Sequence, residues 1–137
     1  MNITNPNKKY KSKNNVIYSC QYHVIFCTKY RRKALTESIQ QRLKELIAEK
    51  ALEYNYTILD MEIMEDHVHL LIDIEPKLGI YQTIIKIKGY SSRILREEFP
   101  ELKSRIPTLW TRSLFISSVG TVSLDMVKEY IANQKGV

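Results

Sequence analysis

Apolar residues recur along the chain with two periods, one typical of strands and one typical of helices. Residues 16–27 are rich in β-branched and aromatic side chains, which predicts a strand buried on much of both faces. Two further runs with strand character are separated only by Glu65 and Asp66, which predicts a hairpin with a tight turn. The strands expected are 16–27, 56–64, 67–74 and about 110–119.

Three other segments carry apolar residues at helical spacing. Thr36 can cap the first helix and Ser123 the last, while Gly89 lowers helix propensity slightly inside the second. The helices expected run from the Thr36 cap to about residue 53, over 80–99, and from the Ser123 cap to about residue 134, with a loop before residue 107. Their apolar stripes are Ile39, Leu43, Leu46, Ile47 and Leu52 in the first helix and Ile84, Ile87, Ile94 and Leu95 in the second.

The order of these elements is strand, helix, strand, strand, helix, strand and a final helix. This order predicts an α+β protein of the ferredoxin-like, split β-α-β type (β-α-β-β-α-β), with a four-stranded antiparallel sheet, two helices on one face and an added C-terminal helix. A chain of 137 residues is the size of one ordinary domain. We therefore expect a single domain over residues 15–137, preceded by a loose polar arm over residues 1–14.

The apolar runs are all much shorter than the ~20 residues of a membrane helix, and the polar start does not resemble a secretory signal. Cys20 and Cys27 lie seven residues apart in one predicted strand, so their side chains should point to opposite faces and stay unpaired. Free thiols fit a reducing compartment. We therefore expect a cytoplasmic protein with no membrane partner.

Positive charge is concentrated at the start of the chain. The net charge is +6, yet residues 1–36 hold no acidic residue, which leaves 13 of the 21 basic residues against all 15 acidic ones in the remainder. Such a concentrated basic region is typical of a protein that binds nucleic acid. The eight basic residues are Lys8, Lys9, Lys11, Lys13, Lys29, Arg31, Arg32 and Lys33.

The predicted strand 67–74 carries two histidines on one face. Its other face is an unbroken apolar set that should face the two packing helices: Val68, Leu70, Ile72 and Ile74. His67 and His69 must then lie on the face that those helices leave open, with Cα atoms roughly 6 to 7 Å apart. Imidazoles at that separation can converge on one metal ion.

The last helix has only this open face left to cover. Tyr130 and Gln134 are spaced i, i+4 on one side of it, beside an apolar stripe of Leu124, Val127 and Ile131 that should dock the helix. Two imidazoles and an amide oxygen leave a divalent ion with open positions for phosphate oxygens. A tyrosine hydroxyl is a nucleophile for phosphoryl transfer when a nearby cation or base activates it.

The chain resembles the single-tyrosine transposases of the IS200/IS605 group, members of the HUH endonuclease superfamily. The signature of that superfamily is two histidines around one apolar residue, here His67-Val68-His69, and the C-terminal helix of the group matches Tyr130 with Gln134 four residues on. The resemblance extends from about residue 16 to residue 134. It includes Tyr22-His23-Val24-Ile25-Phe26, Lys29-Tyr30-Arg31-Arg32, Lys88-Gly89, Ser92, Leu109-Trp110 and Val119-Gly120.

The resemblance implies a metal-dependent DNA transposase that acts on single-stranded, hairpin-bearing ends of an insertion sequence. Tyr130 would form a 5′-phosphotyrosine, and His67, His69 and Gln134 would hold Mg²⁺ or Mn²⁺. A homodimer is implied, in which the tyrosine helix of one subunit can complete the site of the other, with Gly120 as a hinge. The enzyme would be prokaryotic and act at the nucleoid.

Candidate DNA contacts follow from charge and position. His23 resembles a family position but is assigned no chemistry here, because a lone histidine on a strand is more often structural. Hairpin backbone contacts are expected from Lys29, Tyr30, Arg31, Arg32 and Lys33 at the end of the first strand, and from Lys86, Lys88 and Arg93 in the second helix.

Two alternatives compete with this interpretation. The first is a non-catalytic, domesticated module that binds nucleic acid on the same ferredoxin-like scaffold. The second is a metal-dependent phosphodiesterase that acts through water and does not need Tyr130. A covalent adduct between protein and DNA would separate the transposase from both.

Overall fold

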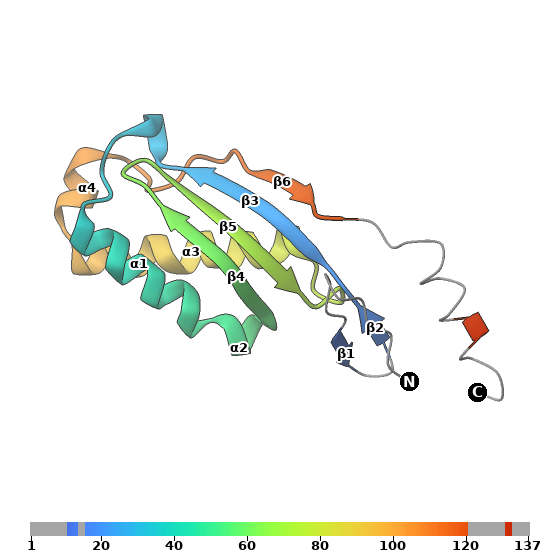
Figure 1. Ribbon diagram of the computed structural model, residues 1–137. Coiled ribbons are helices and arrows are strands. Elements are labelled where there is room, and N and C mark those ends of the chain that lie inside the picture. Colours follow the sequence, from blue (N-terminus) through green and yellow to red (C-terminus); the bar gives the residue numbers. More distant parts are fainter. Residues whose placement is uncertain (1–10, 14–15, 121–130, 133–137) are drawn as a thin grey trace.

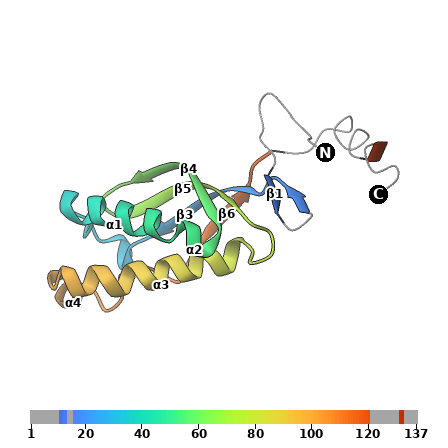
Figure 2. The same cartoon turned by 90° about the horizontal axis from the view of Figure 1, so that it is seen from below.

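The main body of the protein is a four-stranded antiparallel sheet covered on one side by two long helices (Figures 1 and 2). The computed structural model describes residues 11–13, 16–120 and 131–132. Strand order in the sheet is β4-β5-β3-β6, the order of a split β-α-β fold. The elements are β1 (Lys11–Lys13), β2 (Val16–Tyr18), β3 (Gln21–Cys27), η1 (Lys29–Arg31), α1 (Glu37–Glu49), α2 (Ala51–Tyr54), β4 (Tyr56–Ile63), β5 (His67–Ile74), α3 (Ile80–Glu98), α4 (Glu101–Arg105) and β6 (Phe115–Ser118).

The core lies between the sheet and helices α1 and α3. The apolar set of β5 is at most 1% exposed, as are Val24 and Phe26 of β3, so the side of the sheet toward the helices is dry. We call this side the helix face. Trp110 closes one end of the core with its ring edge-on to Phe26, at a centroid distance of 4.8 Å. The buried helical residues are Ile39, Leu43, Leu46 and Ile47 of α1 and Ile84, Ile87 and Leu95 of α3, which confirms most of the predicted stripes.

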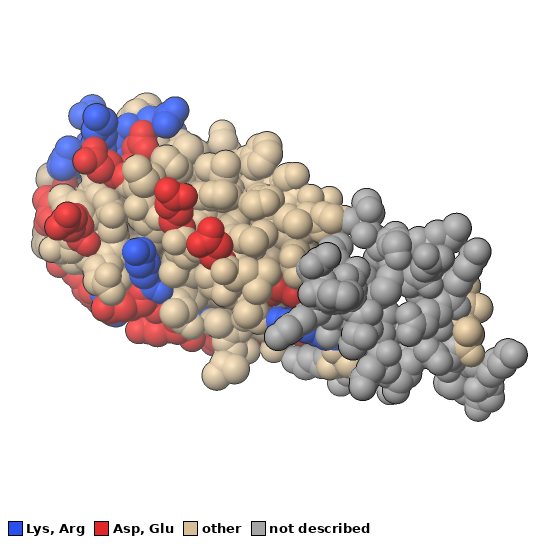
Figure 3. Space-filling view, in the orientation of Figure 1, with Lys and Arg blue, Asp and Glu red and all other residues tan. Residues whose placement is uncertain are grey.

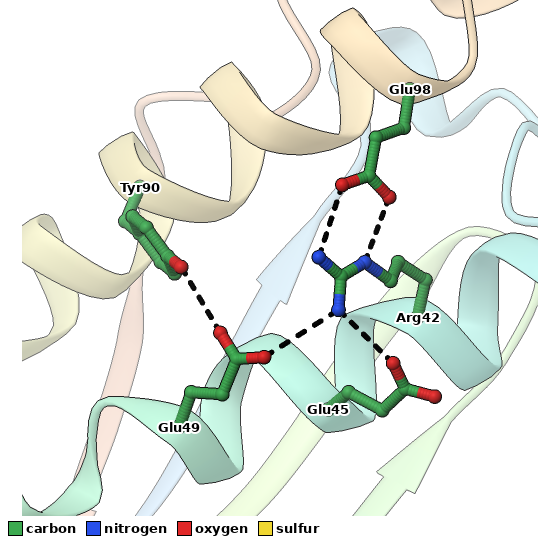
Figure 4. A network of polar contacts seen from close by, with 5 residues as sticks. All are labelled: Arg42, Glu45, Glu49, Tyr90 and Glu98. Carbon is green, nitrogen blue, oxygen red and sulfur yellow. Dashed lines mark hydrogen bonds and ion pairs between the residues drawn. The ribbon is translucent and has the colours of Figure 1, made fainter.

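A polar network joins the outer surfaces of α1 and α3 (Figure 4). Arg42 of α1 donates two hydrogen bonds to Glu98 of α3, at 2.7 and 3.0 Å, and one to Glu45. Glu49 accepts a hydrogen bond from the hydroxyl of Tyr90 across the same helix pair. The bond from Arg42 lowers the pKa of Glu98. Because these groups are exposed to solvent, the network adds little to the free energy of unfolding. It does connect the two helices on their outer surfaces.

The predicted strand 16–27 is in fact two strands. Residues Val16–Tyr18 pair with Lys11–Lys13 in a separate two-stranded sheet, and only Gln21–Cys27 enters the main sheet. The cause is pairing with the preceding chain, which no local pattern in residues 16–18 indicates. The last part of the expected polar arm therefore includes a short strand.

Three other expectations need correction. The predicted strand 110–119 is reduced to Phe115–Ser118, preceded by one antiparallel bridge between Trp110 and Thr28; between them, the carbonyls of Thr111 and Ser113 accept from the ammonium of Lys88. The predicted loop before residue 107 contains the short helix α4. In addition, Leu52 is 92% exposed because the first helix breaks at Lys50, and α2 turns this side chain to solvent.

The predicted last helix lies largely outside the described residues. Ile131 and Ala132 are helical, and Ile131 is 63% exposed. Leu124 and Val127, the other two residues of the expected docking stripe, lie outside the described residues, so the docking of this helix stays a prediction. Among the helices that the structure describes, none has the length and apolar character required to cross a bilayer.

Candidate functional site

His67 and His69 lie on the side of the sheet opposite α1 and α3, which we call the histidine face. Both rings are half-buried, whereas Val68 between them is fully buried on the helix face. Antiparallel pairing places Cys27 of β3 opposite His67, and Ile25 of β3 and Glu62 of β4 opposite His69. The strand parity expected from the sequence is confirmed. The two imidazoles are accessible on the sheet surface, as a metal site for a bulky substrate requires.

A carboxylate and a guanidinium extend from His67 in a short polar chain. His67 Nδ1 lies 2.8 Å from Oδ1 of Asp66, and Arg31 Nη2 donates to the other carboxyl oxygen at 3.2 Å. The hydrogen bond with His67, helped by the charge of Arg31, lowers the pKa of Asp66. At neutral pH Asp66 is thus a carboxylate, which can only accept hydrogen bonds.

His23 of β3 contacts the second histidine. Its Nδ1 lies 3.1 Å from Nε2 of His69, and the two rings are stacked with centroids 5.3 Å apart. His23 pairs across the strands with Leu71, so it reaches His69 on the diagonal. All three histidines of the chain therefore share the histidine face, including the one to which sequence reasoning assigned no chemistry.

Residues 29–33, which we call the basic loop, are fixed next to this site. The backbone N–H of Thr28 donates to the carbonyl of Asp66 at 3.0 Å, and the Thr28 hydroxyl lies between the carbonyls of Arg32, at 2.7 Å, and Asp66, at 3.2 Å. Tyr30 and Arg31 adopt left-handed backbone angles, with φ of 60° and 51°. Such angles are unfavourable for residues other than glycine, and the surrounding contacts must hold them. The strained turn brings Arg31 to Asp66.

The candidate DNA contacts lie in different places. The basic loop lies at the end of the sheet that holds His67, and Figure 3 shows Lys and Arg side chains gathered at this end of the molecule, near η1 and α4. Lys86 and Arg93 are exposed on α3, in the helix layer on the other side of the sheet. Lys88 is only 8% exposed and donates to the carbonyl of Thr111 at 2.7 Å, so it is a structural residue and not a surface contact for DNA.

The remaining site residues, Tyr130 and Gln134, lie outside the described residues. Gly120, the expected hinge before their helix, has φ of 72°, a left-handed angle that favours glycine. Within residues 11–13, 16–120 and 131–132, no three His, Cys, Asp or Glu side chains gather closely enough to hold a metal ion. Two accessible imidazoles, with Nε2 of His67 making no hydrogen bond within the part of the chain that the structure describes, fit two of the donors of a divalent ion, and further donors must come from elsewhere.

Sequence reasoning missed the roles of Asp66 and His23. An acid directly before a candidate ligand histidine is a signal that could have indicated Asp66, because ligand histidines commonly donate their second N–H to a carboxylate. The alternation of side chains in β3 could have placed His23 on the histidine face. Its contact with His69 depends on the register between β3 and β5, which the sequence does not give.

Comparison with known proteins identifies the family. A family model described as "Transposase IS200 like" matches residues 16–134. The ISDra2 transposase TnpA of Deinococcus radiodurans is 32% identical over 120 residues, which cover 86% of each chain. The transposase for insertion sequence element IS200 of Salmonella typhimurium is 30% identical over 119 residues, covering 85% of this chain and 78% of the relative.

Two solved structures are similar in fold. A crystal structure of a Deinococcus radiodurans protein assigned as a transposase matches with a TM-score of 0.72 and 30% identity, covering 90% of this chain and 97% of that one. A REP-associated tyrosine transposase bound to a REP hairpin matches with a TM-score of 0.55 at 11% identity, covering 90% of this chain and 67% of that one. Sequence and fold agree, and the chain belongs to the IS200-like family of transposases.

Proposed function

We propose that this protein cleaves and rejoins single-stranded DNA at the hairpin-bearing ends of an insertion sequence, through a 5′-phosphotyrosine at Tyr130. The observation that carries the proposal is the accessible pair His67 and His69 on the histidine face of a chain that belongs to a transposase family. A pair of accessible imidazoles next to a basic loop suits chemistry on a polyanionic backbone.

The cleavage step exchanges one phosphodiester bond for another. The hydroxyl oxygen of Tyr130 attacks the scissile phosphorus and loses its proton, while the bond from phosphorus to the 3′ oxygen breaks. The leaving strand takes up a proton and ends in a 3′-OH, and the other strand stays on the tyrosine through its 5′ phosphate. Attack by a 3′-OH reverses the step and rejoins strands. Because the bond energy is conserved, no nucleotide cofactor is needed.

The proposed metal ion is Mg²⁺ or Mn²⁺, held by His67, His69 and Gln134. When bound, it would neutralise and polarise phosphate oxygens as negative charge develops on them. The protein itself contributes the fixed imidazoles, the tyrosine nucleophile and the basic loop. Lys29, Arg32 and Lys33 would bind the DNA backbone close to His67, whereas Lys86 and Arg93 would contact DNA only if it reached the helix layer.

The proposed partners are hairpin DNA and a second copy of the chain. The REP-associated transposase to which the fold is similar is described as bound to a hairpin, which supports a hairpin ligand here. Ile131 is 63% exposed and Phe115, on the edge strand β6, is 56% exposed, so apolar surface is left uncovered in the single chain. A homodimer, in which the tyrosine helix of one subunit serves the other, would cover such residues.

The decisive test looks for the covalent intermediate. The protein is incubated with single-stranded hairpin DNA and Mg²⁺, and adducts are separated on a denaturing gel. We expect an adduct that disappears in Tyr130→Phe and in His67→Ala. Tyr81→Phe is the matched control, because Tyr81 is an exposed tyrosine on α3 and should leave the adduct unchanged.

The other outcomes distinguish the alternatives. Hairpin binding with no adduct in the wild-type protein would indicate a domesticated binding module. Cleavage that persists in Tyr130→Phe but needs His67 would indicate a phosphodiesterase that acts through water. A mixture of Tyr130→Phe and His67→Ala chains that regains adduct formation would establish a site shared between two subunits.

A further inference from the structure

The two ring nitrogens of His67 are in different environments, and this difference carries an inference that rests on the proposed function. Nδ1 faces the carboxylate of Asp66 at 2.8 Å. In a neutral imidazole, the nitrogen that meets a carboxylate oxygen at this distance is the one that carries the ring proton, so Nδ1 is the donor and the lone pair lies on Nε2. A metal ion binds a neutral imidazole through the nitrogen that has no proton. The contact therefore selects the tautomer that offers Nε2.

Asp66 is held in place by several contacts around it. The carbonyl of Asp66 accepts from the backbone N–H of Thr28, which is fully buried, and the Thr28 hydroxyl lies between this carbonyl and that of Arg32. The carbonyl of Glu65 accepts from the backbone N–H of Leu35 at 3.0 Å, so a second segment fixes the same turn. The carboxylate thus has a defined position beside His67, unlike the side chain of a free surface turn.

Arg31 completes this arrangement from the basic loop. Its guanidinium donates to Oδ2 of Asp66, the oxygen that does not face His67, at 3.2 Å. The left-handed backbone of Tyr30 and Arg31 directs the side chain toward the turn, at an energetic cost that the fold sustains. Arg31, Arg32 and Lys33 are all exposed, and Arg31 is the one of the three whose side chain contacts Asp66.

We propose that Asp66, oriented by Arg31, is a positioning residue that fixes the tautomer and the orientation of His67, so that Nε2 faces the metal ion. Asp66 does not itself touch the ion or the DNA. Partners of this kind around a ligand histidine raise metal affinity by about 10- to 100-fold. The basic loop then has two functions. Arg31 orients Asp66 at the metal site, and its neighbours bind the DNA backbone.

The test has two readouts that do not depend on DNA cleavage. In the metal-free full chain, ring ¹⁵N chemical shifts report the tautomer of each histidine. We expect His67 to be protonated at Nδ1 in the wild type and to shift toward the Nε2-protonated form in Asp66→Ala. In calorimetric titrations with Mn²⁺, we expect the dissociation constant to rise about 10- to 100-fold in Asp66→Ala and by a smaller factor in Arg31→Ala.

Matched controls separate positioning from charge. Asp60→Ala removes an exposed carboxylate of β4, and Lys44→Ala removes an exposed cation of α1; both should leave Mn²⁺ binding and the His67 tautomer unchanged. Asp66→Asn keeps an acceptor at the same place and guards against misfolding of the alanine variant. Its amide oxygen can still accept from Nδ1, so the loss of affinity should be smaller than in Asp66→Ala.

Two results would overturn the proposal. One is an Asp66→Ala protein with unchanged Mn²⁺ affinity and unchanged tautomer. The other is a loss in Asp66→Asn as large as in His67→Ala without a change of tautomer, which would make Asp66 a direct ligand. If His67→Ala itself leaves Mn²⁺ binding intact, the metal assignment of the proposed function fails, whereas the tautomer measurement still tests the role of Asp66.

Discussion

The two faces of β5 are made from neighbouring residues, yet they have different physical roles. On the helix face, Leu70 and its apolar neighbours are sealed against α1 and α3. On the histidine face, His67 and His69 are half-buried and each ring contacts a polar group, Asp66 for one and His23 for the other. Successive side chains of a strand point to opposite faces, so β5 places its core residues on one side and the proposed metal ligands on the other. A substitution on one face therefore need not disturb the other.

The largest expected effect is on the histidine face. His69→Ala removes one of the two imidazoles proposed to hold the metal, and we expect adduct formation with hairpin DNA to fall by about a thousandfold or more. The free energy of unfolding without metal should change by less than about 1 kcal/mol, because the ring is half-buried at the sheet surface. Adduct gels and urea unfolding measure the two quantities. Cleavage within tenfold of the wild type would remove His69 from the site.

The opposite result is expected one residue further along the strand. Leu70→Ala leaves a cavity in the core and should lower the free energy of unfolding by about 2–5 kcal/mol. Leu71→Ala, on the half-buried histidine face, is the matched control and should cost clearly less. If urea unfolding gave equal losses of unfolding free energy for the two variants, the two faces would contribute equally to stability.

A second pair of variants tests the helix side of the sheet. Lys88→Met removes the ammonium that binds the carbonyls of Thr111 and Ser113, and we expect a loss of about 1–3 kcal/mol in unfolding free energy. Lys86→Met, two residues away on the exposed surface of α3, should change it by less than about 0.5 kcal/mol. If both lysines behave alike in thermal unfolding, the structural role of Lys88 is refuted.

A smaller effect is expected from the contact between histidines. His23→Ala removes the side chain that holds the ring of His69, and we expect Mn²⁺ affinity to fall about tenfold. Ser117→Ala is the matched control, because Ser117 lies opposite His23 in β6 and is exposed. Calorimetric titration of both variants decides the matter. An unchanged dissociation constant in His23→Ala would limit the role of His23 to packing.

The smallest effect concerns the far end of the histidine face. Burial raises the pKa of Asp73, whose Oδ1 has no hydrogen-bond partner, although Lys11 lies 4.0 Å from Oδ2. A raised pKa means that stability is lost as pH rises through the folded-state value, once the buried carboxyl ionises. Asp73→Asn should therefore raise the melting temperature slightly at pH 7.

The pH dependence of this difference checks its sign. The gain in Asp73→Asn should vanish as the pH falls below the ordinary carboxyl pKa of about 3.9, where both side chains are neutral. Melting temperatures of the two proteins across this range measure it. A gain that grows on acidification, or a less stable variant at pH 7, would contradict the assigned cause.

The sequence by itself determined the order of the four strands of the main sheet and of the two long helices, the buried side of most of them, and the face that His67 and His69 occupy. Alternation in a strand and the stripe on a helix are local properties of extended and helical backbone, so they can be identified without knowing what packs against them. The motif residues likewise indicated the family before any contact was known.

Only the tertiary structure decided which side chains meet. His23 and His69 are 46 positions apart in the chain, and their contact depends on the register between β3 and β5. The burial of Lys88 and the reach of Arg31 to Asp66 likewise depend on segments far away in sequence. A local pattern fixes the direction of a side chain but not its neighbour, because neighbours are set by packing between distant segments.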